Sequence, residues 1–140
     1  MKILVVNGPN LNLLGKREPD LYGHKSFEDY FKVLQHKFST HQLDYFQSNH
    51  EGELIDKIHQ TDRSDTKGIV LNAGGYSHTS VALADAVASI STPVISVHIP
   101  NIYNREEERH KELISQYVVG GIFGLGLDGY ELAVQHLINP

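Results

Sequence analysis

Short apolar runs rich in branched residues alternate along the entire chain with stretches whose apolar residues recur every three or four positions. The first run, residues 3–6, ends at Asn7-Gly8-Pro9, and the first helical pattern then extends from Phe27 to Phe38. This alternation favours a parallel sheet with helices on both faces. It predicts strands at residues 3–6, 43–47, 68–71, 93–97 and 118–123, and helices at 27–38, 54–58, 79–90, 105–113 and 130–138.

Five strands within 140 residues indicate one α/β domain that covers residues 1–140. No repeat, low-complexity tract or linker divides the chain. Right-handed crossovers leave few arrangements, and we expect a flavodoxin-like, doubly wound sheet of five parallel strands in the order 2-1-3-4-5. Ser26 is expected to cap the helix at 27–38, and Ser48 with Glu51 has the spacing of a capping box before the next helix.

The composition excludes several classes of protein and site. Lys and Arg number 12 against 17 Asp and Glu, and the net charge of −5 disfavours a protein that binds nucleic acid or anionic membranes. Without cysteine the chain forms no disulfide, thiolate–zinc site or iron–sulfur cluster. No apolar run approaches the roughly 20 residues that cross a bilayer, and the N-terminus has no signal-peptide pattern. We therefore expect a cytoplasmic protein.

Polar side chains concentrate where three of the expected strands end. In the order 2-1-3-4-5 the first, third and fourth strands are neighbours, and ligands in such sheets bind beyond the carboxyl ends of the strands. The first of the three loops is long for a strand–helix connection, as active-site lids often are. The loops bring to one edge of the sheet Asn10, Arg17 and Tyr22 from the first, Asn72 and His78 from the second, and His98, Arg105 and Arg109 from the third.

Two of these features have a second interpretation that remains open at this point. The first loop also fits a surface excursion built on glycine and proline. Arg105 and Arg109, four residues apart on an expected helix, either face the site together or form salt bridges on a solvated surface. The partners in the second case are Glu106 and Glu108.

Two further patterns argue against a cofactor and a metal. Residues 124–129 match the dinucleotide-binding pattern G-x-G-x-x-G, but they follow the last strand, and no later strand can carry the acidic residue expected about 20 positions on. Tight packing of strand against helix explains the glycines better. The nine histidines include no pair spaced i, i+4, so the sequence offers no local metal motif. We expect a site without metal or cofactor.

The combination of tyrosine, arginine, histidine and asparagine suits proton transfer. His78 and His98 can donate or accept protons near neutral pH. Tyrosine, whose usual pKa is about 10, acts as a base only where a neighbouring charge stabilises its phenolate. Arg17 lies five residues before Tyr22 and can supply that charge. Arginine pairs such as the one in the third loop also bind carboxylates.

These residues stand in motifs that resemble those of the type II 3-dehydroquinate dehydratases, also called type II dehydroquinases. The resemblance covers nearly the whole chain and is strongest in the first loop, in residues 7–15 with Arg17-Glu18-Pro19 and Tyr22-Gly23. No single one of these motifs is specific to the family, but their combination in one chain is highly specific. The further matches are residues 47–52, residues 72–80, Val97-His98-Ile99, Gly124-Leu125-Gly126 and Gly129-Tyr130.

The resemblance implies a reaction and a role for each matching residue. The reaction is the reversible conversion of 3-dehydroquinate into 3-dehydroshikimate by anti elimination through an enolate, without a cofactor. The implied catalytic residues are Tyr22 as base, Arg17 and Arg105 beside it, Asn10 at the enolate oxygen through water, and His98 as the acid that protonates the departing hydroxyl. The implied substrate-binding groups are Asn72 and His78 at the hydroxyls, the Ile99 backbone and Arg109 at the carboxylate, and Asp85 from a neighbouring subunit. The implied assembly is a dodecamer, a tetramer of trimers.

Two positions near His98 depart from the family pattern. Ser96 stands where the family usually has the glutamate that orients and charges the imidazole. Unless another carboxylate replaces that glutamate, we expect activity to fade at lower pH on the alkaline side. Pro100, at a substrate-binding position where serine is common, has no N–H to donate to the carboxylate. Its loss of a donor should weaken binding by up to roughly 10–100-fold.

The fold alone also admits functions of other classes. A receiver domain needs acidic residues after the first strand, and a flavin-binding domain needs a Ser/Thr-Gly-rich phosphate loop there, whereas this chain has Asn7-Gly8. A degenerate enzyme retained for a structural role is the third interpretation, given Ser96 and Pro100. The sequence leaves open whether the reaction serves aromatic biosynthesis or quinate breakdown.

Overall fold

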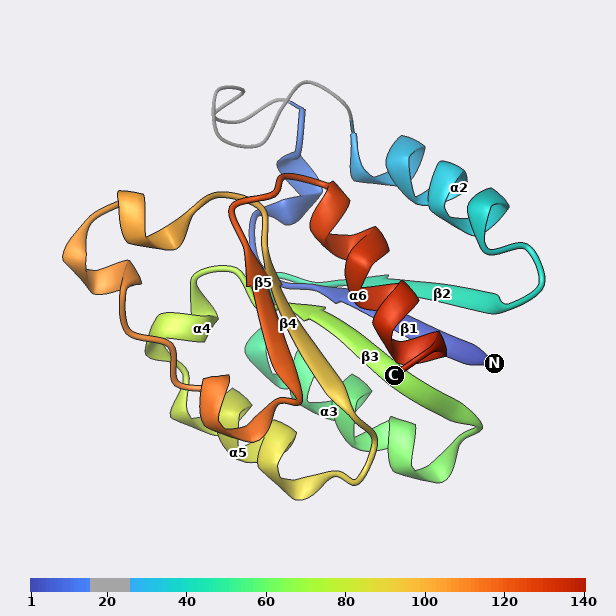
Figure 1. Ribbon diagram of the computed structural model, residues 1–140. Helices are drawn as coiled ribbons and strands as arrows, with labels where there is room; N and C mark the ends of the chain where they lie inside the picture. Colours follow the sequence, from blue (N-terminus) through green and yellow to red (C-terminus); the bar gives the residue numbers. More distant parts are fainter. Residues whose placement is uncertain (16–25) are drawn as a thin grey trace.

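The computed structural model describes residues 1–15 and 26–140, and the predicted sheet is confirmed in both its order and its direction. Five strands, all paired in parallel, lie in the order β2-β1-β3-β4-β5 (Figure 1). Each strand includes the run predicted for it or most of that run. The strands are β1 (Lys2–Asn7), β2 (Gln42–Gln47), β3 (Thr66–Asn72), β4 (Val94–His98) and β5 (Gly120–Phe123).

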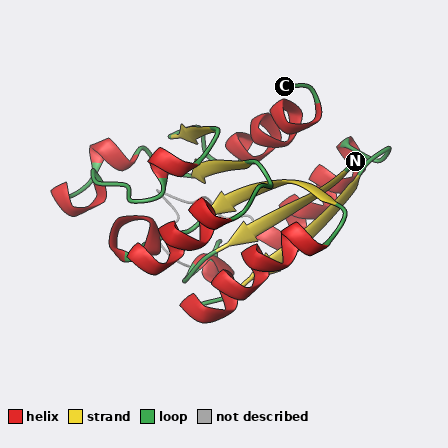
Figure 2. Cartoon of the chain, turned by 90° about the horizontal axis from the view of Figure 1, so that it is seen from below, coloured by secondary structure: helices red, strands yellow, loops and turns green. Residues whose placement is uncertain are grey.

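Helices cover both faces of the sheet, as the alternation predicts. One face packs against α2 (Phe27–Lys37) and α6 (Asp128–Ile138), and the other against α3 (Glu51–Gln60) and α5 (Val81–Ser89) (Figures 1 and 2). Ile3 and Val5 belong to the first core, and Leu4 and Val6 to the second, because successive strand residues point to opposite faces. Within residues 1–15 and 26–140, no helix has the length and apolar character needed to cross a membrane.

The remaining elements are short turns of helix near the carboxyl edge of the sheet and at loop ends. They are η1 (Leu11–Leu13), η2 (Thr61–Arg63), α4 (Tyr76–Thr79), η3 (Ile102–Asn104), η4 (Glu107–Arg109) and η5 (Ser115–Tyr117).

One of the two predicted helix starts is confirmed and the other is wrong. The Ser26 hydroxyl accepts a hydrogen bond from the Asp29 N–H at 3.2 Å and caps α2. The expected capping box does not form, because α3 begins two residues later than that box requires, directly after His50. The Ser48 hydroxyl instead accepts the His50 N–H at 2.9 Å, and the Glu51 carboxylate accepts a hydrogen bond from Ser80.

Two predicted helices differ from the structure. The helix expected at 79–90 begins two residues later, as α5, because Ser80 has an extended backbone and its hydroxyl caps the Leu83 N–H at 2.9 Å, and the short helix α4 before it was not predicted. The charged helix expected at 105–113 is reduced to η4, and Arg105 before it is extended. None of the three residues of η4 is buried, so this segment lacks the packing that stabilises most helices in proteins.

Strand register holds the loops after β1 and β3 together. Asn7 and Asn72 are register partners at the ends of these strands. The Gly8 N–H then donates to the Asn72 carbonyl at 2.7 Å. A Cβ on Gly8 would lie only 2.5 Å from the Ala73 carbonyl oxygen, so this approach requires glycine. The first residues of the two loops are therefore hydrogen-bonded to each other and packed closely together at the edge of the sheet.

Candidate active site

A polar cavity lies beyond the carboxyl ends of β1, β3 and β4, at the edge where the sequence places the ligand. The loop after β1 contributes Asn10, and the other predicted residues come from the last residues of β3 and β4 and from the loops that follow them. Among the described residues that line the cavity, the arginines are the fully charged groups and none is acidic, so the cavity suits an anionic ligand. The lining comprises Pro9, Asn10, Leu11, Asn72, Gly74, Gly75, His78, His98, Pro100, Ile102, Arg105 and Arg109.

Four of the predicted site residues are not part of this lining. Arg17 and Tyr22 lie outside the described residues. Ile99 is 2% exposed and lies next to the cavity in sequence, and its carbonyl accepts the Gly126 N–H at 3.0 Å. Asp85 is exposed on α5.

Both interpretations of the arginine pair hold in part. Arg105 and Arg109 line the cavity together, although they do not share an α-helix. The Arg109 Nε also donates to Glu106 Oε1 at 2.5 Å, and this hydrogen bond holds the pKa of Glu106 below its usual value. This hydrogen bond uses Nε and leaves out the two terminal nitrogens of Arg109, which are the atoms that bind a carboxylate in a two-pronged contact.

His98 ends β4 and is only 6% exposed. Its Nε2 lies 2.5 Å from Oε1 of Glu112, a residue for which the sequence analysis predicted no role. The Ser96 hydroxyl donates to the same oxygen at 3.2 Å. The loss of activity expected from Ser96 depended on no other carboxylate replacing the family glutamate. Glu112 is such a carboxylate, because it reaches the imidazole from elsewhere in the chain.

Burial and hydrogen bonding act in opposite directions on the pKa of Glu112. Burial favours the neutral acid, but the hydrogen bond and the charge of His98, with hydrogen bonds from Ser115 and Ser96, outweigh burial and lower the pKa to about 2. Glu112 is therefore ionised at neutral pH.

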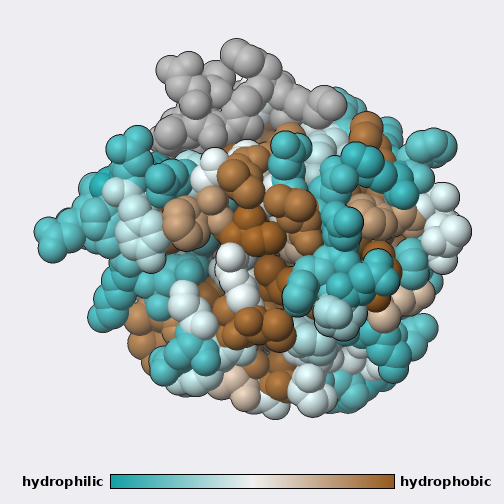
Figure 3. Space-filling view, viewed as in Figure 1, coloured by the Kyte–Doolittle hydropathy of each residue, from teal (hydrophilic) through white to brown (hydrophobic). Residues whose placement is uncertain are grey.

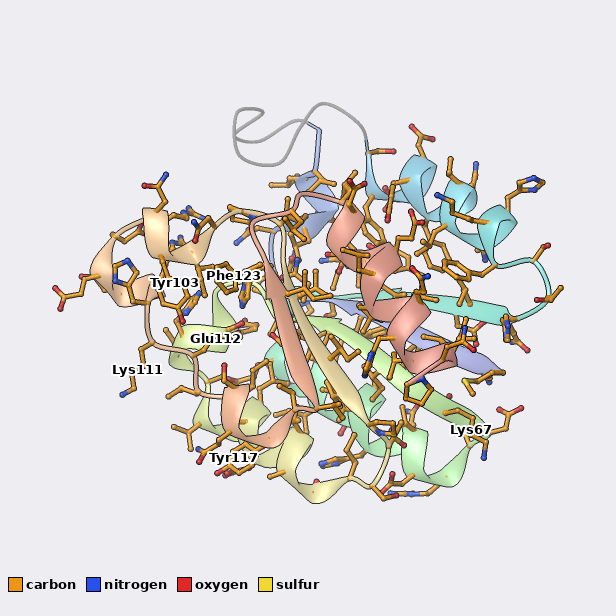
Figure 4. All side chains as sticks on the ribbon, in the orientation of Figure 1. Lys67, Tyr103, Lys111, Glu112, Tyr117 and Phe123 are labelled. Carbon is orange, nitrogen blue, oxygen red and sulfur yellow. The ribbon has the colours of Figure 1, made fainter. Side chains whose placement is uncertain are left out.

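Two hydrogen bonds to α4 bring Glu112 to this position. The Lys111 carbonyl accepts from His78 Nδ1 at 2.7 Å, and the Leu113 N–H donates to the Ser77 carbonyl at 2.8 Å. The residue between them points inward while Lys111 points away from the molecule (Figure 4). No local sequence signal marks Glu112, which stands 14 positions after His98.

The two site histidines lie against each other. The ring centroids of His78 and His98 are 5.6 Å apart, with an angle of 24° between the planes. Burial lowers the pKa of His78, and the hydrogen bond to the Lys111 carbonyl opposes that change only in part. His78 is therefore a neutral ring at pH 7 that donates through Nδ1 to the backbone, which leaves Nε2 as an acceptor.

An uncharged network lies under the other side of the cavity. The Tyr130 hydroxyl donates to Asn7 Oδ1 and accepts from Asn72 Nδ2, both at 2.8 Å. Asn72 Oδ1 accepts the Gly74 N–H at 3.1 Å. Complete burial raises the pKa of Tyr130, so the phenol stays neutral. The sequence predicts Tyr130 only as part of the closing helix and as a family match, and its contact with Asn72 was not predicted.

The G-x-G-x-x-G segment serves close packing between β5 and α6. A Cβ on Gly129 would lie 3.3 Å from side-chain carbons of Ile122 and Val97, so the helix approaches the sheet closely at this point. Within the described part of the chain, no three His, Asp or Glu side chains gather in a way that could hold a metal ion.

Comparison with known proteins identifies the same family along the whole chain. The family model for dehydroquinase class II matches residues 1–138. The chain is 51% identical to a 3-dehydroquinate dehydratase of Francisella philomiragia, with 99% of this chain and 95% of the relative covered. It is 46% identical to a 3-dehydroquinate dehydratase of Halothermothrix orenii, over 99% and 94% of the two chains.

Solved structures agree with these sequence matches. The crystal structure of a type II dehydroquinase from Butyrivibrio crossotus superposes with a TM-score of 0.96 at 44% identity, covering 99% of this chain and 98% of the other. A 3-dehydroquinate dehydratase-like protein from Bifidobacterium longum superposes with a TM-score of 0.70 at 30% identity, covering 100% and 99%.

Proposed function

Because the chain belongs to the class II dehydroquinase family, we propose that His98 is the acid and Tyr22 the base of its reaction. The reaction itself is the reversible dehydration of 3-dehydroquinate to 3-dehydroshikimate. It breaks a C–H bond next to the ketone and a C–O bond at the neighbouring carbon, and it releases water. One group must accept the proton and another must protonate the hydroxyl as it leaves.

The observation that carries this assignment is the position of His98. Its ring lines the cavity, is nearly buried, and is held through Nε2 by the ionised carboxylate of Glu112. A general acid must be held in a defined position toward the substrate. His78 beside it has a lowered pKa and is suited to hydrogen bonding with a substrate hydroxyl rather than to donating the proton.

The other roles follow from charge and from the family resemblance. Arg109 binds the substrate carboxylate, supported by its place in the cavity and by two terminal nitrogens that the hydrogen bond to Glu106 does not use. Asn72 binds a hydroxyl, and Asn10 stabilises the enolate oxygen through water. Arg17, with Arg105, stabilises the Tyr22 phenolate, so that the tyrosine accepts the proton next to the ketone.

A direct assay tests the function. Purified protein is mixed with 3-dehydroquinate, and the absorbance of the conjugated enone product is followed with and without a chelator. We expect equal turnover in both conditions, and Tyr22→Phe should lower kcat by at least roughly 10²–10⁴-fold. No product from the wild-type protein would overturn the function, and near-normal turnover of the Phe variant would overturn the role of Tyr22.

We further propose that the protein assembles with copies of itself, as a dodecamer, in the cytoplasm. Apolar side chains gather over β5 (Figure 3), the edge strand that pairs with β4 alone in the described part of the chain, where Val119, Phe123 and Leu125 are each 45% exposed or more. Tyr103 lies against Phe123, with ring centroids 5.1 Å apart (Figure 4). Exposed apolar patches of this kind support subunit contacts. The exposed position of Asp85 is compatible with a contact to the cavity of a neighbouring subunit.

Light scattering during size-exclusion chromatography gives the number of subunits directly. We expect twelve chains of 15.7 kDa in one particle. A monomer with full activity would contradict both the assembly and the proposed contact from Asp85.

A further inference from the structure

Glu112 is the charged group nearest the proposed acid for which neither the sequence nor the family resemblance supplies a role. Its carboxylate lies 2.5 Å from His98 Nε2, and the two side chains are only 13% and 7% exposed. Ion pairs shielded from water in this way interact far more strongly than pairs on the surface. The contact between Glu112 and His98 is therefore a strong interaction.

Both carboxylate oxygens of Glu112 are held in place. Ser96 donates to Oε1 at 3.2 Å, and Ser115 donates to Oε2 at 2.5 Å. On each side of Glu112 in the chain, the backbone is bonded to α4 through Lys111 and Leu113. The carboxylate therefore has one fixed position beside the imidazole.

We infer that Glu112 is a positioning residue that replaces the carboxylate absent at Ser96 and keeps the His98 imidazole oriented and protonated for proton donation, an inference that rests on the proposed function. An ionised carboxylate only accepts hydrogen bonds, so Nε2 carries a proton in both charge states of the ring. The proton that the ring gains and loses is then the one on Nδ1.

Among the described residues, the other charged or titratable groups around His98 do not favour its protonation. His78 from α4 stacks on the ring, and Arg105 and Arg109 from the segment after β4 line the same cavity. Positive charge at any of these positions disfavours an imidazolium. Glu112 is the carboxylate that offsets them, and Ser77 and Ser96 contribute only neutral hydroxyls.

Removing the charge tests the inference through the pH profile. In Glu112→Gln, the alkaline limb of kcat should move to lower pH by about one to two units, because the acid form is no longer favoured. KM should change less than about threefold, since Glu112 does not line the cavity. Glu107→Gln, an exposed glutamate in η4, is the matched control and should retain the wild-type profile.

Moving the charge tests whether its position in the chain matters. In the double variant Ser96→Glu/Glu112→Ser, the carboxylate starts from β4, and the alkaline limb should return to within about half a unit of the wild-type position. A wild-type limb in Glu112→Gln, or no recovery in a folded double variant, would overturn the inference. If neither variant folds, Glu112 serves stability and the inference is wrong.

Histidine NMR separates this inference from the proposed function. In ¹⁵N-histidine-labelled protein without substrate, the titration midpoint of His98 should fall in Glu112→Gln and recover in the double variant. This result with a wild-type protein that does not convert 3-dehydroquinate would overturn the function and leave the effect of Glu112 on the ring intact. An unchanged midpoint in a protein that turns over would overturn the inference alone.

Discussion

The two sides of the cavity are built in different ways. At the ends of β1 and β3, Asn7, Asn72 and Tyr130 form a neutral, buried network, in which strand register places the two amides as partners and the Tyr130 hydroxyl joins them. Beyond β4, the ionised Glu112 contacts His98, and this charged side of the cavity depends on hydrogen bonds between a loop and α4. The neutral side can hold a substrate at any pH near neutrality, whereas the charged side can move a proton and must respond to pH.

The largest effect should come from removing the proposed acid. His98→Asn keeps a polar side chain of similar size but cannot donate a proton, so kcat should fall by roughly 10²–10⁴-fold while KM changes little. Steady-state kinetics at pH 7 measure this, and the exposed His59→Asn in α3 serves as control. A near-normal kcat in His98→Asn would show that His98 is not the acid and that proton transfer does not occur on the charged side of the cavity.

A smaller effect, on substrate binding, should come from position 100, where proline leaves the charged side of the cavity without a backbone N–H donor. Pro100 lines the cavity and has no N–H, so Pro100→Ser should lower KM by up to roughly 10–100-fold and raise kcat less. Pro100→Ala restores the same N–H without a hydroxyl and separates the two contributions. If KM is unchanged in both variants, the N–H at position 100 does not face the substrate.

The ion pair should also stabilise the fold in a way that depends on pH. The pKa of Glu112 is lowered to about 2 in the folded protein, so its contribution is complete above the carboxyl pKa of the unfolded chain, near 4.5, and is lost as the pH falls toward 2. Glu112→Gln should lower the free energy of unfolding at pH 7 by at most about 3 kcal/mol. Urea denaturation at pH 7, 4 and 2.5 measures the difference in the free energy of unfolding between the wild type and Glu112→Gln. This difference should become smaller as the pH falls. An equal loss at every pH would assign the effect to packing.

The neutral network should give a smaller effect without that pH dependence. Tyr130→Phe removes the hydroxyl that joins Asn7 and Asn72, at a cost of about 1–2 kcal/mol in the free energy of unfolding. The raised pKa of Tyr130 keeps the phenol neutral, so the loss should be the same from pH 5 to pH 9. The exposed Tyr117→Phe is the control in the same denaturation experiment. A loss that changed across this range would show that the network titrates and would remove the contrast between the two sides.

The sequence predicted the parts of the site that follow directly from a strand. Asn72 and His98 stand at the ends of β3 and β4, and apolar runs located these strand ends to within a residue or two. Arg105 and Arg109 were placed at the cavity although the predicted helix between them is wrong, because a loop that follows β4 leaves the sheet at the same edge in either conformation.

What the sequence determined by itself is the alternation of strands and helices, the sheet order and the edge at which the polar loops meet. Each of these depends on local periodicity and on general rules of chain connection. Only the tertiary structure decided that Glu112 supplies the carboxylate absent at Ser96. That contact requires residues 111 and 113 to bind α4 through backbone groups, and backbone hydrogen bonds between distant segments leave no pattern in the side chains.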